Sequence, residues 1–121
     1  MTWASGLDAW HNWGEGSETM ANQPGTITAR GAIAREPGQP ASIEEFLVPA
    51  PGPGEARVTL LASGVCHTDL SAKNGVFGTE GFPFLLGHEG AAVVESVGEG
   101  VTNVKPGDHV ILAWRAPCGE C

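Results

Sequence analysis

Glycine and proline interrupt this chain so often that no long helix fits between them. The 121 residues include 18 Gly and 9 Pro. Glycine adopts turn conformations that other residues avoid, and proline, which lacks a backbone N–H, breaks helices and strand pairs. The chain must therefore be built from short elements joined by many turns, in one domain of modest size.

The segments between these turns have the pattern of β-strands. Strands are predicted for residues 26–34 (TITARGAIA), Ser42–Val48, Ala56–Val65 and Gly90–Gly98, and for a stretch after the Pro106-Gly107 turn. Apolar and β-branched residues at alternating positions are typical of half-buried strands. No strand–helix–strand unit is visible, so the pattern predicts a mainly β fold, a small barrel or sandwich.

One short helix is predicted directly after the third strand. The run CHTDLSAKNG starts at Cys66, and the pair Asn74-Gly75 is a typical helix stop. The next run, GVFGTEGFPFLL (residues 75–86), is predicted to be a loop with aromatic anchors.

The first 25 residues differ from the rest, and we assign residues 26–121 to the folded domain. Trp3, Trp10 and Trp13 lie among Gly, Ser, Asn and acidic residues, which predicts a disordered N-terminal extension. Two alternatives remain open. The tryptophans form an interaction peptide, or residues 1–19 are not native coding sequence, since Met20 opens a run that resembles an ordinary start.

The charge balance argues against polyanionic partners. Six Lys and Arg face 14 Asp and Glu, for a formal net charge of -8. An acidic chain repels phosphate groups, so neither nucleic acid nor an anionic membrane is an expected partner. Three cysteines, no apolar run of membrane-spanning length and no signal peptide predict a cytoplasmic protein with reduced thiols.

Cys66 and His88 form the first candidate site. Each lies where a loop meets a predicted element, and a thiolate and an imidazole are two ligand types of catalytic zinc sites. Asp69 follows closely, and a carboxylate there could hold the second nitrogen of a ligand histidine. The alternative for each residue alone is structural: a small buried cysteine and a buried histidine.

Cys118 and Cys121 form the second candidate site, at the end of the sequence. A Cys-x-x-Cys pair is either half of a four-ligand structural zinc site or a redox pair. A thioredoxin-type redox pair needs a βαβ context with a helix after it, so half a zinc site is favoured. Ser63 lacks a Gly-x-Ser-x-Gly context, and His109 is predicted to be a surface residue.

The motifs SGVCHTDL, FPFLLGHEGAAVVESVGEGVTNVKPGDHV and CGEC together resemble the zinc-dependent alcohol dehydrogenases of the medium-chain dehydrogenase/reductase superfamily. The resemblance covers residues 28–121. The run VILAWRAPCGEC is similar to the mycothiol- or glutathione-dependent formaldehyde dehydrogenases. The resemblance implies a GroES-like β-barrel with a short helix after Cys66.

The resemblance also implies a role for each matched residue. Zinc would act as a Lewis acid on an alcohol oxygen, and a hydride would pass to NAD or NADP. The implied roles are Cys66 and His88 as catalytic-zinc ligands, Glu89 as the acidic group beside that zinc, Thr68 as the proton-accepting hydroxyl, His67 near the cofactor pyrophosphate, Asp69 as the partner of His88, and Cys118 and Cys121 as structural-zinc ligands.

The sequence departs from the family in what it lacks. A third catalytic cysteine, two further structural-zinc cysteines and the Rossmann domain are absent from these 121 residues. Ser71 stands where some members carry a relay histidine. We therefore expect an N-terminal catalytic-domain fragment that ends inside the structural-zinc lobe, binds zinc weakly and is inactive alone. The parent protein is expected to be a homodimer or homotetramer that acts on a small alcohol or a thiol–formaldehyde adduct.

Two alternatives of another class remain. A stand-alone GroES-like barrel would be a binding or assembly module, and a seven-fold ring on a sizing column would favour it. A small structural zinc-binding domain is the other, and the missing ligands argue against it.

Overall fold

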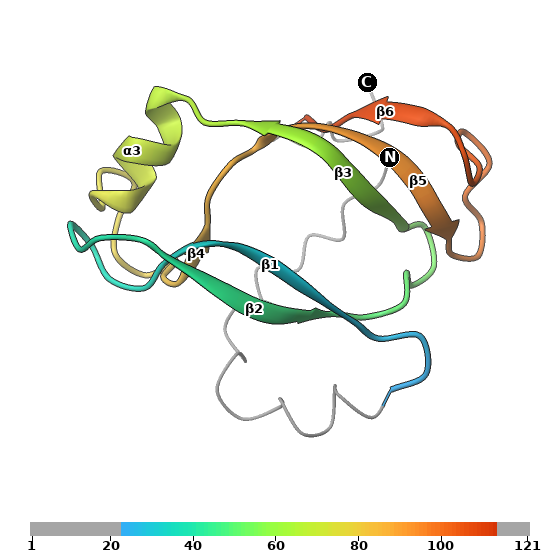
Figure 1. Cartoon of the computed structure of the whole chain (residues 1–121), viewed down its shortest axis with the longest axis horizontal. Helices are drawn as coiled ribbons and strands as arrows, with labels where there is room; N and C mark the ends of the chain where they lie inside the picture. The colour runs from blue at the N-terminus through green and yellow to red at the C-terminus, as the bar shows by residue number, and fades with distance from the viewer. Residues whose placement is uncertain (1–22, 114–121) are drawn as a thin grey trace.

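Two small antiparallel sheets and one helix make up the protein in the computed structural model, which describes residues 23–113 (Figure 1). The two sheets lie one above the other, and the helix lies at one end of them. The first sheet has the strand order β2-β1-β4, with β1 Ile27–Ala34, β2 Ser42–Val48 and β4 Phe84–Leu85. The second has the order β3-β5-β6, with β3 Ala56–Gly64, β5 Glu89–Val97 and β6 His109–Ile111.

The prediction of a mainly β fold with a short helix after Cys66 is confirmed, and the predicted strands differ from the observed ones mainly at their ends. The prediction for residues 75–86 is wrong at Phe84–Leu85, which form β4 rather than loop. These two residues pair with Ile33 and Ala34 at the end of β1. A two-residue strand is too short to show a periodic pattern, and it exists because β1 offers unpaired backbone groups there.

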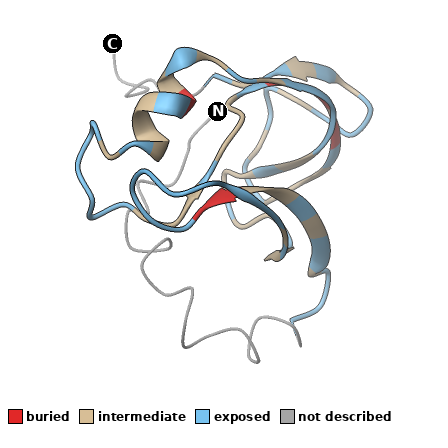
Figure 2. Cartoon of the chain, turned by 60° about the vertical axis from the view of Figure 1, so that its left-hand side comes forward, coloured by how far each residue is buried: buried red, intermediate tan, exposed pale blue. Residues whose placement is uncertain are grey.

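The core of residues 23–113 is small (Figure 2). Its buried apolar side chains are Ile33, Ala34, Ala92 and Val94, each at most 3% exposed. Ala92 and Val94 are two positions apart on β5, so both point to the same face of their sheet. Ile111 on β6, in contrast, is 82% exposed.

The helix α3, His67–Lys73, begins where side chains satisfy its free backbone groups. The Cys66 sulfur accepts a hydrogen bond from the Thr68 N–H (3.2 Å), and the Asp69 carboxylate accepts one from the Cys66 N–H (3.0 Å). This capping box fixes Cys66 and Asp69 relative to each other. In residues 23–113 no helix is long and apolar enough to cross a membrane.

Candidate metal centre

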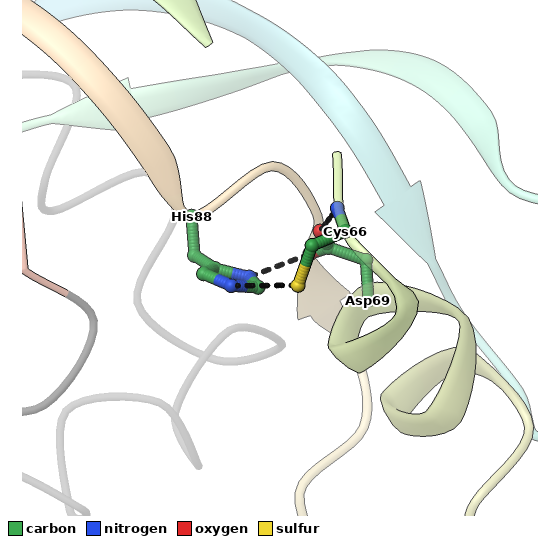
Figure 3. Close-up of side chains that lie close together, drawn as sticks. All are labelled: Cys66, Asp69 and His88. Atoms are coloured by element: carbon green, nitrogen blue, oxygen red, sulfur yellow. Dashed lines mark hydrogen bonds and ion pairs between the residues drawn. The ribbon is translucent and has the colours of Figure 1, made fainter. Parts of the chain in front are cut away.

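Cys66, Asp69 and His88 converge on one point of the fold (Figure 3). Their possible ligand atoms all lie within 4.8 Å of one another. The pairing of β3 with β5 explains the convergence, because Gly64 at the end of β3 lies opposite Glu89 at the start of β5. The residue two positions after β3 and the residue just before β5 are thereby brought side by side.

The Asp69 carboxylate is the hub of the hydrogen bonds in this cluster. Its Oδ1 atom accepts from the Gly87 N–H (2.9 Å) and faces His88 Nδ1 (3.1 Å). Its Oδ2 atom accepts from the Cys66 N–H. Asp69 is 5% exposed, and it is the only polar or charged side chain classed as buried in the described part of the chain. Because N–H groups occupy both oxygens, Asp69 suits an orienting role better than that of a metal ligand.

Two opposing effects set the pKa of Asp69. Burial acts to raise the pKa, since the charged form loses hydration. Hydrogen bonds from the Gly87 and Cys66 N–H groups and from His88 outweigh burial, so the pKa lies below its usual range. Asp69 is therefore a carboxylate at neutral pH, as a group that accepts three hydrogen bonds must be.

Asp69 also determines which ring nitrogen of His88 faces Cys66. With Nδ1–H donated to Asp69, Nε2 is left toward the Cys66 sulfur, at 3.2 Å. The hydrogen bond with Asp69 is the main cause that raises the pKa of His88. Hydrogen bonds from the Thr68 side chain and backbone lower the pKa of the Cys66 thiol. Each shift favours the charged form of its own residue relative to that residue's ordinary state.

The donor set fits a zinc ion. Typical bonds of about 2.3 Å to sulfur and about 2.0 Å to imidazole nitrogen, at a tetrahedral angle, put the two ligand atoms about 3.5 Å apart. Sγ of Cys66 and Nε2 of His88 are 3.2 Å apart, so a small opening of the pair would admit the ion. Thiolate and imidazole are ligands that zinc prefers, and a carboxylate behind the histidine is the usual second partner.

The other residues predicted for this site lie around the cluster. Thr68 is half-buried at the start of α3, and its backbone N–H donates to the Cys66 sulfur at 3.2 Å. His67 is exposed, and its Nδ1 lies 3.4 Å from the Ser71 hydroxyl. Glu89 opens β5, and its carboxylate lies across Gly64, where an added Cβ would meet Oε2 at 2.5 Å.

A pocket of about 540 Å³ opens beside the cluster. His88 and Glu89 form its polar side, and the remaining lining is apolar or glycine: Gly90, Ala91, Ile111, Leu112 and Ala113. An apolar cavity with a few polar groups is the usual form of a small-molecule site.

Some predicted site residues lie elsewhere. Cys118 and Cys121 lie outside the described residues, as do Trp3, Trp10 and Trp13. His109 is exposed on β6, which confirms the surface prediction.

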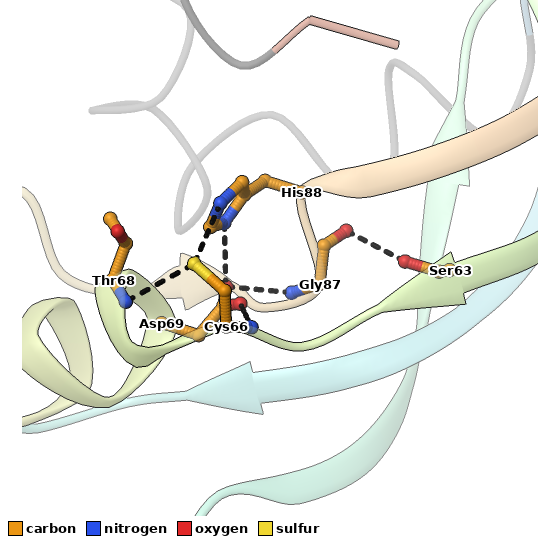
Figure 4. A network of polar contacts seen from close by, with 6 residues as sticks. All are labelled: Ser63, Cys66, Thr68, Asp69, Gly87 and His88. Atoms are coloured by element: carbon orange, nitrogen blue, oxygen red, sulfur yellow. Dashed lines mark hydrogen bonds and ion pairs between the residues drawn. The ribbon is translucent and has the colours of Figure 1, made fainter. Parts of the chain in front are cut away.

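Sequence reasoning missed Ser63 and Gly87 at the site. The Ser63 hydroxyl donates to the Gly87 carbonyl at 2.9 Å (Figure 4). The available signal was the place of Ser63 in the same SGVC run as Cys66, close to the site in the chain.

The fold and the cluster together define a small, mainly β domain in which a cysteine and a carboxylate-oriented histidine could hold a metal ion. Residues 52–121, more than half of the chain, match the model of the alcohol dehydrogenase GroES-like domain. The chain therefore belongs to the alcohol dehydrogenase GroES-like domain family, and the predicted resemblance is confirmed.

Individual relatives agree with this family. The chain is 50% identical over 105 residues to S-(hydroxymethyl)glutathione dehydrogenase of Candida maltosa, an overlap of 87% of the chain and 27% of that protein. It is 50% identical over 101 residues to alcohol dehydrogenase class-3 of Pisum sativum, covering 84% and 27%. The chain spans about a quarter of the length of these curated relatives.

Solved structures show the same likeness. An alcohol dehydrogenase zinc-binding domain protein from Burkholderia ambifaria superposes with a TM-score of 0.74 at 44% identity, over 79% of this chain and 25% of that one. The GroES-like fold expected from the sequence is thus confirmed.

Proposed function

We propose that the protein containing these residues is a zinc-dependent dehydrogenase that oxidises an alcohol, or a thiol adduct of formaldehyde, with NAD or NADP. The observation that carries the proposal is the Cys66–His88 pair, with Asp69 behind the histidine, in a chain of this family. The names of the Candida maltosa and Pisum sativum relatives support the substrate class. We further propose a cytoplasmic location, because free thiols persist in a reducing compartment. The homodimer or homotetramer stays a prediction from the family resemblance.

Cys66 and His88 would hold the metal, which supplies Lewis-acid polarisation of the substrate oxygen when bound. Asp69 keeps the Nδ1–H form of His88, so that Nε2 stays available as a ligand. The pocket lined by His88 and Glu89 gives a small substrate access to this side of the cluster. Ile111 and Leu112 give this pocket an apolar side against which the carbon chain of a small substrate could pack.

Thr68 would accept the proton of the substrate alcohol. Thr68 lies directly beside the candidate metal ligand Cys66, whose sulfur accepts a hydrogen bond from the Thr68 backbone N–H. We assign His67, exposed at the start of α3, to the cofactor pyrophosphate, and Glu89 to the edge of the metal site.

Two parts of the proposal lie wholly or mostly outside the described residues 23–113. Cys118 and Cys121 would be two ligands of a structural zinc, and residues 1–25 an extension preceding the domain 26–121. The 121 residues provide two protein ligands for the catalytic metal, so they should bind zinc weakly and show no turnover by themselves.

The test uses the complete protein encoded by the reading frame that contains these residues. Reduction of NAD or NADP is measured with primary alcohols and with S-hydroxymethyl thiols, together with bound zinc. His88→Gln should lose zinc from the catalytic site and abolish turnover. His109→Gln removes an exposed histidine of β6 and should change neither. Full zinc content and turnover in His88→Gln would refute the proposal.

A further inference from the structure

Both backbone polar groups of Gly87, the residue before His88, are held by side chains (Figure 4). Its N–H donates to Asp69 Oδ1 at 2.9 Å. Its carbonyl accepts from the Ser63 hydroxyl, also at 2.9 Å. Asp69 belongs to α3 and Ser63 to β3, so the two attachments come from different elements.

The carbonyl of Gly87 belongs to the peptide that carries the N–H of His88. The orientation of this peptide sets the backbone angle of His88, and therefore the direction in which its imidazole leaves the chain. Fixing the Gly87 carbonyl thus limits where Nε2 of His88 can lie relative to Cys66.

The backbone of Gly87 is also one that needs support. Its φ is +92°, a region that residues with side chains rarely adopt. A Cβ added there would lie 2.9 Å from the Ser63 hydroxyl oxygen, so that hydroxyl occupies the space that only a glycine leaves open. Ser63 and the unusual turn at Gly87 therefore fit each other in shape as well as in hydrogen bonding.

We propose that Ser63 is a positioning residue of the metal centre, which acts by fixing the Gly87 carbonyl and through it the imidazole of His88. The proposal rests on the proposed function, in which Cys66 and His88 bind the metal. Ser63 holds His88 from the side of β3, as Asp69 does from the side of α3. Loss of one neutral hydrogen bond predicts a loss of metal affinity of about three- to tenfold.

The test is a Co²⁺ titration of the 121-residue chain that carries Cys118→Ser and Cys121→Ser. In this background the absorption of bound cobalt comes only from the Cys66–His88 site. Visible and near-ultraviolet absorption gives the affinity and the ligand geometry. Ser63→Ala should weaken Co²⁺ binding by the stated factor and alter the cobalt spectrum. Ser63→Thr keeps a hydroxyl and should restore both. Thr59→Ala removes an exposed hydroxyl from the same strand and should change neither.

A second measurement needs no metal. In the metal-free protein, the NMR shifts of the His88 ring and the exchange rate of the Gly87 amide should change in Ser63→Ala and return in Ser63→Thr. If circular dichroism shows that Ser63→Ala is unfolded, Ser63→Cys, a poorer donor of similar size, takes its place.

The outcomes separate this inference from the proposed function. If the parent chain and its His88→Gln variant bind Co²⁺ alike, the proposed function fails, while the metal-free shifts still decide the role of Ser63. Unchanged affinity, spectrum and His88 shifts in Ser63→Ala would overturn the inference, as would a Ser63→Thr variant that behaves like Ser63→Ala.

Discussion

The Nε2 atom of His88 lies 3.2 Å from the Sγ atom of Cys66, although 22 positions separate the two residues in the chain. Neither residue lies inside a strand: Cys66 caps α3, and His88 precedes β5. Their meeting depends on the β3–β5 pairing and on the Asp69 carboxylate, which bonds to the backbone of one and the ring of the other. The candidate metal centre is therefore assembled by strand register and one buried charge.

Replacing the charged carboxylate of Asp69 should weaken metal binding. Asp69→Asn keeps the size of the side chain, but its NH₂ group cannot accept the hydrogen bonds that one carboxylate oxygen receives. We expect a loss of zinc affinity of about 10- to 100-fold. Competition with a chelator of known affinity measures it. Glu45→Gln, an equal charge change at an exposed position of β2, should leave the affinity unchanged.

The lowered pKa of Asp69 predicts that the free energy of unfolding decreases in acid. Because the pKa is lower in the folded than in the unfolded protein, Asp69 stabilises the fold fully above about pH 3.9, the usual value for an unfolded chain. That contribution is lost as the pH falls through the folded-state pKa. Urea unfolding of the metal-free protein from pH 6 to pH 2 should show this decline, and Asp69→Asn should show a shallower one. Equal slopes for the two proteins would contradict the assignment.

The small core predicts strong dependence on single side chains. Ile33 is 3% exposed, so Ile33→Ala should lower the free energy of unfolding by about 2–4 kcal/mol. Ile43 is 63% exposed on the neighbouring strand, and Ile43→Ala should cost less than about 1 kcal/mol. Urea denaturation of the two variants compares the same deletion at a buried and an exposed site. Similar losses would mean that Ile33 does not lie in the core.

Gly64 should be intolerant of a side chain because of Glu89. An alanine Cβ would lie 2.5 Å from Oε2 and 3.1 Å from Cβ of Glu89. We expect Gly64→Ala to destabilise the protein by about 1–3 kcal/mol through crowding, although alanine normally favours a strand over glycine.

The matching control is the double-mutant cycle with Glu89→Ala, which removes the carboxylate but keeps Cβ. The cost of Gly64→Ala, measured by urea denaturation, should shrink in that background. Additive losses would show that Glu89 does not lie over Gly64 in solution.

The sequence was sufficient for much of this account because several of its signals are local. Turn residues delimited the strands, and the Asn74-Gly75 pair stopped the helix close to the predicted residue. Cys66, Asp69 and His88 could be named as a group because their residue types match zinc chemistry. Their convergence in the structure supports that choice.

Other features depend on register between distant segments, which no single-sequence pattern contains. β4 at Phe84–Leu85 exists only because β1 lies beside it. The contact of Ser63 with Gly87 joins residues 24 positions apart, and the burial of Asp69 follows from the packing of α3 against the loop before β5.

X-ray absorption at the zinc edge tests the central claim most directly. The sample is the 121-residue chain with Cys118→Ser and Cys121→Ser, to which zinc is added at less than the protein concentration. We predict one sulfur at about 2.3 Å and one imidazole nitrogen at about 2.0–2.1 Å, with oxygen completing the shell. Cys66→Ser should remove the sulfur and His88→Gln the imidazole. A zinc shell without sulfur, or one unchanged in both variants, would contradict the assignment of Cys66 and His88 as the metal ligands.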